Sequence, residues 1–328
     1  MEVNGKTVPD FGYATFSEVV AAAEAAGASI SDVVLAQQAA AMEVSCDELF
    51  EQMAGRLRVM DEGVEPGCAA ELRSTSGLTG GDAHRMREAA RSGGSLLGRV
   101  MDGALYRALA VSELNAAMGR IVAAPTAGSC GILPAAVLTM RDERGCDERA
   151  CVMSLFTAAA VGLVIERNAS LAGAEGGCQA ETGSAAAMAA AAVVELAGGT
   201  PSQAESAAST AIQNLLGLVC DPVAGLVEVP CVKRNASGVA VALVAAELAL
   251  AGCGNVIPAD EAIAAMRRVG VGMPPALRET AEGGLAVTPT GLSLAERVFG
   301  RPADGGAARV GTTGAPGARG CGACRACR

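Results

Sequence analysis

The apolar part of this sequence consists mainly of alanine, the residue with the highest helix propensity. Residues 184–197, SAAAMAAAAVVELA, show this most clearly. Small side chains also let neighbouring helices approach closely, and few segments alternate polar and apolar residues with a period of two. The sequence therefore predicts a mainly α fold, a compact multi-helix domain with Gly-rich loops and little or no sheet.

Several expected helices begin with a capping box, in which a Ser or Thr stands three residues before a Glu or Gln. Thr15, Ser45 and Thr200 begin such boxes. Helix is also expected over residues 85–118. The longest apolar run, residues 150–165, is shorter than the roughly 20 residues that cross a membrane. We therefore expect this run to form a buried helix, and we expect no membrane partner.

A change of composition near residue 302 divides the chain into two parts. We expect one folded domain over residues 1–302 and a tail over residues 303–328, rich in Gly, Ala, Arg and Cys, without fixed structure. The chain has a net charge of −10 and shows no basic groove, so nucleic acid is not an expected partner. The first ten residues lack the apolar segment of a signal peptide, which predicts a cytoplasmic location.

Twelve cysteines in a cytoplasmic chain argue for metal binding or catalysis rather than for a disulfide scaffold, with inert buried thiols as the alternative. Cys178, Cys220 and Cys231 each lie within two residues of a Gly or Pro. Irregular backbone of this kind can direct thiolates toward a common point. The spacing itself matches neither a zinc C-x₂-C pair nor the ferredoxin run, so it leaves the metal open.

Gly-rich loops interrupt the helical sequence at residues 73–84, 124–132 and 173–183, and a fourth irregular stretch covers residues 218–235. Successive Gly N–H groups in such loops can receive an anion, and Ser and Thr hydroxyls can donate hydrogen bonds to a ligand. Each loop can equally be a simple connection between helices. The residue types alone do not decide between these two interpretations.

Four motifs taken together resemble one family. APTAGSCGILPA, GAEGGCQAETGSAAAMAAAA, NLLGLVCDPVAGLVEVPCVKRNA and SGLTGGDA are similar to the α chain of iron–sulfur-dependent L-serine dehydratase (L-serine ammonia-lyase), over about residues 15–300. The resemblance implies a helical fold and a [4Fe–4S] cluster held by Cys178, Cys220 and Cys231, with one iron open to substrate. It also implies β-elimination of L-serine to pyruvate and ammonia, within L-serine catabolism and gluconeogenesis, and a separate β subunit.

Other functions remain open at this point. A related cluster-dependent lyase acting on L-cysteine or L-threonine would share the three thiol ligands, and a non-catalytic iron–sulfur sensor or a purely structural helical protein are alternatives from other classes. Pyridoxal phosphate is not expected as a cofactor, because the only lysines are Lys6 and Lys233 and no doubly wound sheet is predicted.

The resemblance assigns the loops SGLTGGDA and PTAGS to substrate binding. Asn168 also lies in a family-like stretch, although a helix C-cap is an alternative role for it. The residues expected to bind L-serine are Ser74, Ser76, Gly77, Thr79, Gly80, Gly81, Thr126, Gly128, Ser129 and Asn168.

Two further residues are candidates for roles in the reaction. His84 is the only histidine and is a candidate general base by its ordinary pKa, although the resemblance places the base on the β partner. Cys327 lies in a C-terminal C-x₂-C-x₂-C run and is a candidate tail ligand for the open iron. Lack of fixed structure, or adventitious metal binding, is the alternative for this tail.

Overall fold

The computed structural model describes residues 2–3, 6–7, 12–93 and 95–300. Within these ranges the chain forms fourteen α-helices, and its only sheet pairs the two-residue strands β1 (Glu2–Val3) and β2 (Lys6–Thr7). The prediction of a mainly α fold with little sheet is confirmed. The predicted tail, residues 303–328 with Cys327, lies outside the described residues.

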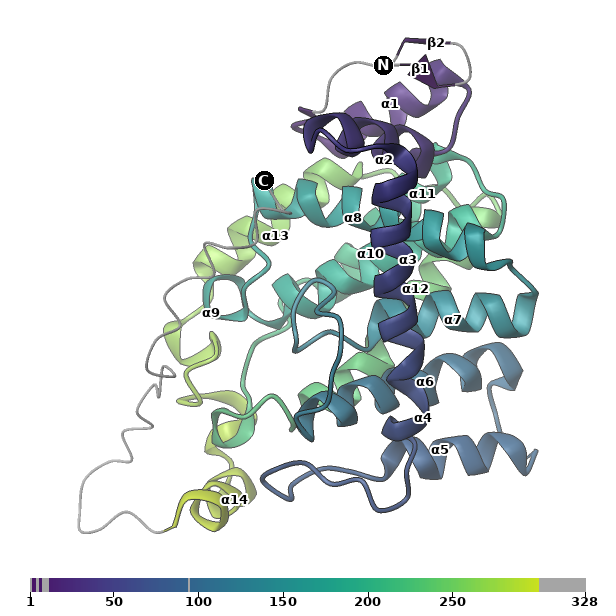
Figure 1. Cartoon of the computed structure of the whole chain (residues 1–328). Helices are drawn as coiled ribbons and strands as arrows, with labels where there is room; N and C mark the ends of the chain where they lie inside the picture. The colour runs from purple at the N-terminus through teal and green to yellow at the C-terminus, as the bar shows by residue number, and fades with distance from the viewer. Residues whose placement is uncertain (1, 4–5, 8–11, 94, 301–328) are drawn as a thin grey trace.

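The N-terminal helices α1 (Phe16–Ala26), α2 (Ile30–Ala41), α3 (Cys46–Glu62) and α4 (Val64–Gly67) pack along one side of the molecule (Figure 1). Helices α1 and α3 start at the predicted caps, whereas α2 starts at an unpredicted capping box of Ser29 with Asp32, and α4 has no side-chain cap. Thr15 forms a complete capping box with Glu18, whereas Ser45 accepts a hydrogen bond from the N–H of Glu48 without the reciprocal bond. Side-chain caps satisfy backbone N–H groups that a helix start leaves without intrahelical partners.

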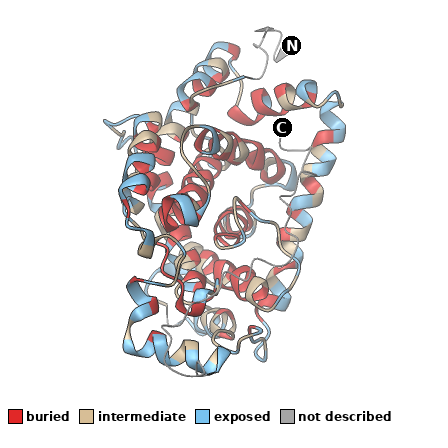
Figure 2. Cartoon of the chain, turned by 90° about the vertical axis from the view of Figure 1, so that its left-hand side faces the viewer, coloured by how far each residue is buried: buried red, intermediate tan, exposed pale blue. Residues whose placement is uncertain are grey.

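Two helices form the centre of the core, α8 (Glu148–Asn168) and α10 (Ser184–Leu196). Every residue of α10 from Ser184 to Val194 is buried, because its alanines allow neighbours to approach from all sides. Figure 2 shows that the buried residues are concentrated in the helices at the middle of the molecule. Helices α7 (Ile132–Arg144), α11 (Pro201–Leu215) and α12 (Cys231–Leu250) pack against α10, and α6 (Gly98–Ala116) packs against α7 and α12.

Helix α8 contains the long apolar run. By length and composition it could cross a membrane, but 72% of its most apolar window is buried inside the protein. Its residues from Cys151 to Ile165 pack almost entirely against other helices. The predicted buried helix is therefore confirmed.

The expected helix over residues 85–118 is divided. Helix α5 (Asp82–Arg91) ends before Gly93, and α6 begins at Gly98; both glycines have positive φ, +74° and +77°. Backbone in this left-handed region cannot continue an α-helix. The break lets α5 turn back and pack along α6.

The remaining elements surround the Gly-rich loops. The short helix α9 (Gly173–Gly176) leads into the π-helical turn η1 (Gln179–Gly183), and α13 (Ala259–Gly272) packs against α9. The last helix, α14 (Pro289–Phe299), lies at the periphery and buries only Gly291 (Figure 1). Three 3₁₀ turns complete the fold: η2 (Val223–Gly225), η3 (Pro275–Leu277) and η4 (Gly284–Val287).

Candidate functional site

Three thiols reach one buried region from separate elements. Cys178 precedes η1, Cys220 lies in the irregular stretch after α11, and Cys231 is the first residue of α12. They are 3%, 3% and 7% exposed. Burial raises the pKa of Cys231 to about 12, and the neighbouring Cys178 adds to this rise. Burial also raises the pKa of Cys220, with contributions from Glu181 and from the other two thiols.

The raised pKa values describe thiols that stay protonated until something stabilises their charge. A bound metal does this directly, because a thiol that coordinates a metal ion releases its proton and binds as the thiolate. Three soft sulfur donors are the ligand type that favours Zn, Cu(I) or an iron–sulfur cluster. The donor set therefore fits the group that the sequence resemblance implies.

Within the described residues, no three His, Cys, Asp or Glu side chains converge on a position that one metal ion could occupy. A cubane cluster distributes its ligands over separate irons, so its thiolates need not converge on one atom. The thiol region is therefore compatible with such a cluster, which needs no single-ion site.

Glycines leave space next to Cys220. A Cβ atom added at Gly173 would lie 3.0 Å from Cys220 Sγ and 2.7 Å from Glu181 Oε2. A Cβ atom at Gly128 would lie 3.0 Å from Glu181 Oε1. The two glycines come from different Gly-rich loops, so both loops face one acidic side chain beside a predicted ligand. A larger residue at either position would fill this space.

Glu181 is a site residue that the sequence analysis missed. Its Oε1 accepts a hydrogen bond of 2.8 Å from Thr126 Oγ1, and its Oε2 lies 3.9 Å from Cys220 Sγ. Burial raises the pKa of this carboxyl group. Glu181 therefore connects the 124–131 loop to the thiol region, and an acidic residue within the apolar stretch of residues 178–197 was the signal that could have identified it.

Asn235 fixes the same loop from the other side. Its side chain is fully buried; Oδ1 accepts from Gly131 N (2.8 Å), and Nδ2 donates to Gly128 O (2.8 Å) and to Cys231 O (2.9 Å). Nδ2 also lies 3.2 Å from Ser112 Oγ on α6. One amide, a single turn after Cys231, thus fixes the 124–131 loop on the start of α12.

Arg234 brings a positive charge into the thiol region. Its Nη1 donates to Val219 O (2.9 Å) and its Nη2 to the buried Asp221 (2.8 Å), so it holds the segment around Cys220. Burial raises the pKa of Cys178, while a Thr182 hydroxyl 3.1 Å away and the Arg234 charge act to lower it. A half-buried cation is well placed to offset the negative charge of a cluster held by thiolates.

The SGLTGGDA loop lies against the segment that precedes Cys231. Ser76 Oγ and Thr79 Oγ1 donate to Glu228 Oε2 at 2.9 and 3.0 Å, and Glu228 is 6% exposed. Ser74 Oγ accepts from Thr79 N (3.2 Å) and closes the loop on itself. The two hydroxyls that were expected to donate to L-serine therefore donate to a protein carboxylate in this structure.

The glycines of this loop shape its backbone. Gly77, Gly80 and Gly81 all have positive φ. Gly80, at φ +134°, is the most constrained, because an added Cβ would lie 2.2 Å from Leu72 O. A residue with a side chain at this position could neither adopt the backbone conformation easily nor avoid the carbonyl.

His84 lies in the first turn of α5, directly after this loop. Its Nδ1 is buried without a hydrogen-bond partner among the described residues. The ring makes no hydrogen bond to the three thiols or to Glu228 within the same part of the chain. The structure thus gives this candidate base no polar contact to the rest of the site.

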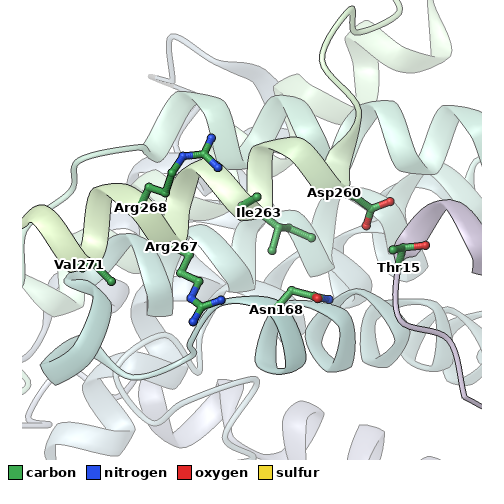
Figure 3. A pocket seen from close by; sticks show the side chains of 8 residues that line it. Thr15, Asn168, Asp260, Ile263, Arg267, Arg268 and Val271 are labelled. Atoms are coloured by element: carbon green, nitrogen blue, oxygen red, sulfur yellow. The ribbon is translucent and has the colours of Figure 1, made fainter.

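Asn168 belongs to a different cavity, of about 540 Å³, which Figure 3 shows together with Arg267 and Asp260. Its Nδ2 donates to Val164 O (2.8 Å) and to Ala14 O (2.7 Å). These bonds match the alternative role at the end of helix α8. The cavity is larger than the one beside Glu228, about 280 Å³, but none of the three thiols lines it. Its volume alone is therefore no argument for chemistry there.

Comparison with known proteins identifies the family. Residues 25–286 match the family described as serine dehydratase alpha chain. The probable L-serine dehydratase alpha chain of Bacillus subtilis (strain 168) is 52% identical over 250 residues, which cover 76% of this chain and 83% of the relative. The corresponding chain of Latilactobacillus sakei is 54% identical over 202 residues, 62% of this chain and 97% of the relative.

A third relative differs in length. L-serine dehydratase TdcG of Escherichia coli (strain K12) is 41% identical over 242 residues, which cover 70% of this chain but only 52% of the relative. Residues 25–286, which match the family, include the three buried thiols, the two loops fixed to α12 and the alanine-rich core helix α10. The family match spans most of the folded chain and agrees with the two alpha-chain relatives, so this protein belongs to the serine dehydratase alpha chain family.

Proposed function

We propose that this protein is the α subunit of an L-serine ammonia-lyase that uses a [4Fe–4S] cluster to eliminate water from L-serine. The observation that supports this most strongly is the gathering of three buried thiols around the start of α12, to which both hydroxyl-bearing loops are also bound. The names of the relatives supply the substrate. A cytoplasmic location and a role in L-serine catabolism and gluconeogenesis belong to the same proposal.

In the proposed reaction, the Cα proton and the 3-hydroxyl of L-serine leave as water. The resulting aminoacrylate becomes an imine, and addition of water releases pyruvate and ammonia. When bound, the cluster supplies an open iron that stabilises negative charge on the substrate carboxylate and on the departing hydroxyl.

The chain's own residues prepare this site. Cys178, Cys220 and Cys231 would hold the cluster, and Arg234 would offset its charge. Asn235 and Glu181 hold the 124–131 loop in place from two sides. Burial of the thiols excludes bulk water, which strengthens electrostatic interactions with the substrate.

The general base belongs, in this proposal, to a separate β subunit. Two relatives named as L-serine dehydratase, from Streptomyces coelicolor and Escherichia coli, align with this chain over only 44% and 52% of their length. Such proteins have room for a second domain in the same chain. The alpha-chain names of the shorter relatives fit a division of these parts between two subunits.

The proposal does not involve pyridoxal phosphate. Lys233 is 80% exposed and lies 3.8 Å from Asp82. A Schiff-base lysine needs a desolvated site, and this side chain is exposed.

The test is pyruvate release from L-serine under anaerobic conditions, with iron and sulfide reconstitution and with a candidate β chain. Cys178→Ser, Cys220→Ser and Cys231→Ser should each lose iron and turnover, whereas Cys253→Ser, at an exposed thiol, should retain both. Full iron content in any of the first three variants would contradict the ligand assignment. A fully reconstituted complex that turned over L-threonine or L-cysteine but not L-serine would contradict the substrate assignment.

A further inference from the structure

Glu228 connects the start of α12 with the SGLTGGDA loop. Its carbonyl oxygen accepts from Val232 N at 2.9 Å, which places its backbone in the first turn leading into α12, three residues before Cys231. Its carboxylate reaches the SGLTGGDA loop, 152 residues away from Ser76 in sequence, and accepts from Ser76 and Thr79. One residue therefore spans the distance between a predicted cluster ligand and a predicted substrate loop.

Few other polar contacts join these two units. Among the described residues, the only other ion pair or hydrogen bond between residues 74–82 and 226–233 is the Lys233–Asp82 pair, at 3.8 Å with Lys233 80% exposed. An exposed pair of this kind contributes little to structure. The two hydroxyl bonds to the buried carboxylate are therefore the main polar connection between the loop and the start of α12.

The loop also has space in which to move. A cavity of about 280 Å³ lies beside the contact and is lined by Thr79, Gly80, Glu228, Pro230 and Lys233, among others. The loop itself contains three glycines with positive φ, whose backbone loses much conformational entropy on ordering. Both ends of the loop are anchored elsewhere, since Thr75 N donates to Ala116 O (3.2 Å) and Asp82 N donates to Glu113 Oε1 (2.9 Å). The Glu228 carboxylate therefore acts on how the middle of the loop lies against the start of α12.

We propose that Glu228 is a positioning residue, which holds the 74–81 loop against the cysteine-bearing start of α12 by accepting hydrogen bonds from Ser76 and Thr79. The two hydroxyls then act on the substrate through loop geometry rather than by direct donation. This inference rests on the proposed function only for the identity of the ligand. The contact itself is independent of that function.

The geometry requires the Glu228 side chain to accept hydrogen bonds and does not require it to carry a charge. Both donors are neutral hydroxyls and both address the same oxygen, Oε2. A Gln side chain can present one acceptor oxygen at that position. Glu228→Gln should therefore retain the loop, whereas Glu228→Ala should release it.

The experiment compares Glu228→Ala and Glu228→Gln in the cluster-reconstituted complex with its β partner, with Glu247→Ala on the exposed face of α12 as the matched control. Hydrogen exchange of the amides in residues 74–81 is measured first, because it needs no turnover. We expect exchange at least about tenfold faster in Glu228→Ala, equivalent to about 1.4 kcal/mol of local opening. Glu228→Gln and Glu247→Ala should stay within about threefold of the parent protein.

Kinetics and iron content follow on the same samples. Glu228→Ala should raise KM for L-serine about tenfold while kcat and iron content change less than about threefold. The double variant Ser76→Ala/Thr79→Val should show the same faster exchange as Glu228→Ala. Adding Glu228→Ala to the double variant should accelerate exchange by less than about threefold more, because the contact is already lost. This second variant tests the contact from the loop side if Glu228→Ala does not fold.

Three results would overturn the proposal. Unchanged exchange in Glu228→Ala would show that the carboxylate does not hold the loop, and equal exchange in the Gln and Ala variants would show that acceptance is not its role. A lower KM in Glu228→Ala would show that Glu228 competes with the substrate carboxylate instead of positioning the loop. If the parent complex shows no L-serine turnover, the proposed function fails, while the exchange data still decide the role of Glu228.

Discussion

Replacing Asn235 with Ala should destabilise this protein much more than replacing an exposed polar residue. The side chain is completely buried and joins four partners on three parts of the chain: Gly131 N, Gly128 O, Cys231 O and Ser112 Oγ. Gly131 is 104 residues away in sequence, so the contact fixes tertiary rather than local structure. Alanine would leave these groups without their partner in a site that water cannot easily enter.

The magnitude follows from the groups left unsatisfied. Each buried donor or acceptor that loses its partner costs about 1–3 kcal/mol. Gly131 N and Gly128 O lose their bonds of 2.8 Å, whereas Cys231 O lies one turn earlier in the same helix and Ser112 can reorient. We therefore expect Asn235→Ala to lower the free energy of unfolding by about 2–5 kcal/mol, in the range of large effects for point mutations.

Urea or guanidinium unfolding of the apo α chain measures this loss. Asn214→Ala is the matched control, because that exposed amide donates only to Thr210 O within its own helix and its loss should cost less than about 0.5 kcal/mol. A loss below about 1 kcal/mol for Asn235→Ala would refute the reasoning. It would mean that the 124–131 loop is held by other contacts.

Two further outcomes test the core and the loop. Burial raises the pKa of Glu195, so its folded pKa lies above the unfolded value, and its contribution to stability is present at low pH and lost as pH rises through the folded pKa. As pH rises from about 4.3, the parent protein should lose unfolding free energy relative to the Glu195→Gln variant. A difference in unfolding free energy between the two proteins that stays constant from pH 4 to 8 would contradict this. Gly80→Ala should lower the free energy of unfolding by at least about 2 kcal/mol, because both the positive φ and the Leu72 carbonyl oppose a Cβ atom. Gly77→Ala should lower it by about 1 kcal/mol, because a Cβ atom there would meet no neighbouring atom within 4 Å. Equal losses for the two glycines would show that the close approach does not matter.

Local sequence signals predicted the framework of this fold correctly. Alanine content predicted the buried helix α10, the capping boxes at Thr15 and Thr200 predicted two helix starts, and the apolar run at residues 150–165 predicted the core helix α8. These signals depend on residues within a few positions of one another. The division between α5 and α6 was missed, although Gly93 and Gly98 lie at the break.

The candidate site depends on contacts that no local pattern encodes. The bonds from Ser76 and Thr79 to Glu228 join residues 152 and 149 positions apart. The motifs led us to expect hydroxyls free to donate to L-serine, because nothing in SGLTGGDA reveals an acceptor so distant in the chain. For Asn168 the sequence left a ligand contact and a helix C-cap open, and in the structure its Nδ2 donates to Val164 O at the end of α8.

The central claim is that three thiolates hold a cluster whose remaining iron binds L-serine. Mössbauer spectroscopy of the anaerobically reconstituted complex, recorded before and after addition of L-serine, tests it most directly. The account predicts one iron distinct from the other three, whose signal alone changes when L-serine binds. Four equivalent irons that do not respond to L-serine, or no cluster in a complex that nevertheless releases pyruvate, would contradict it.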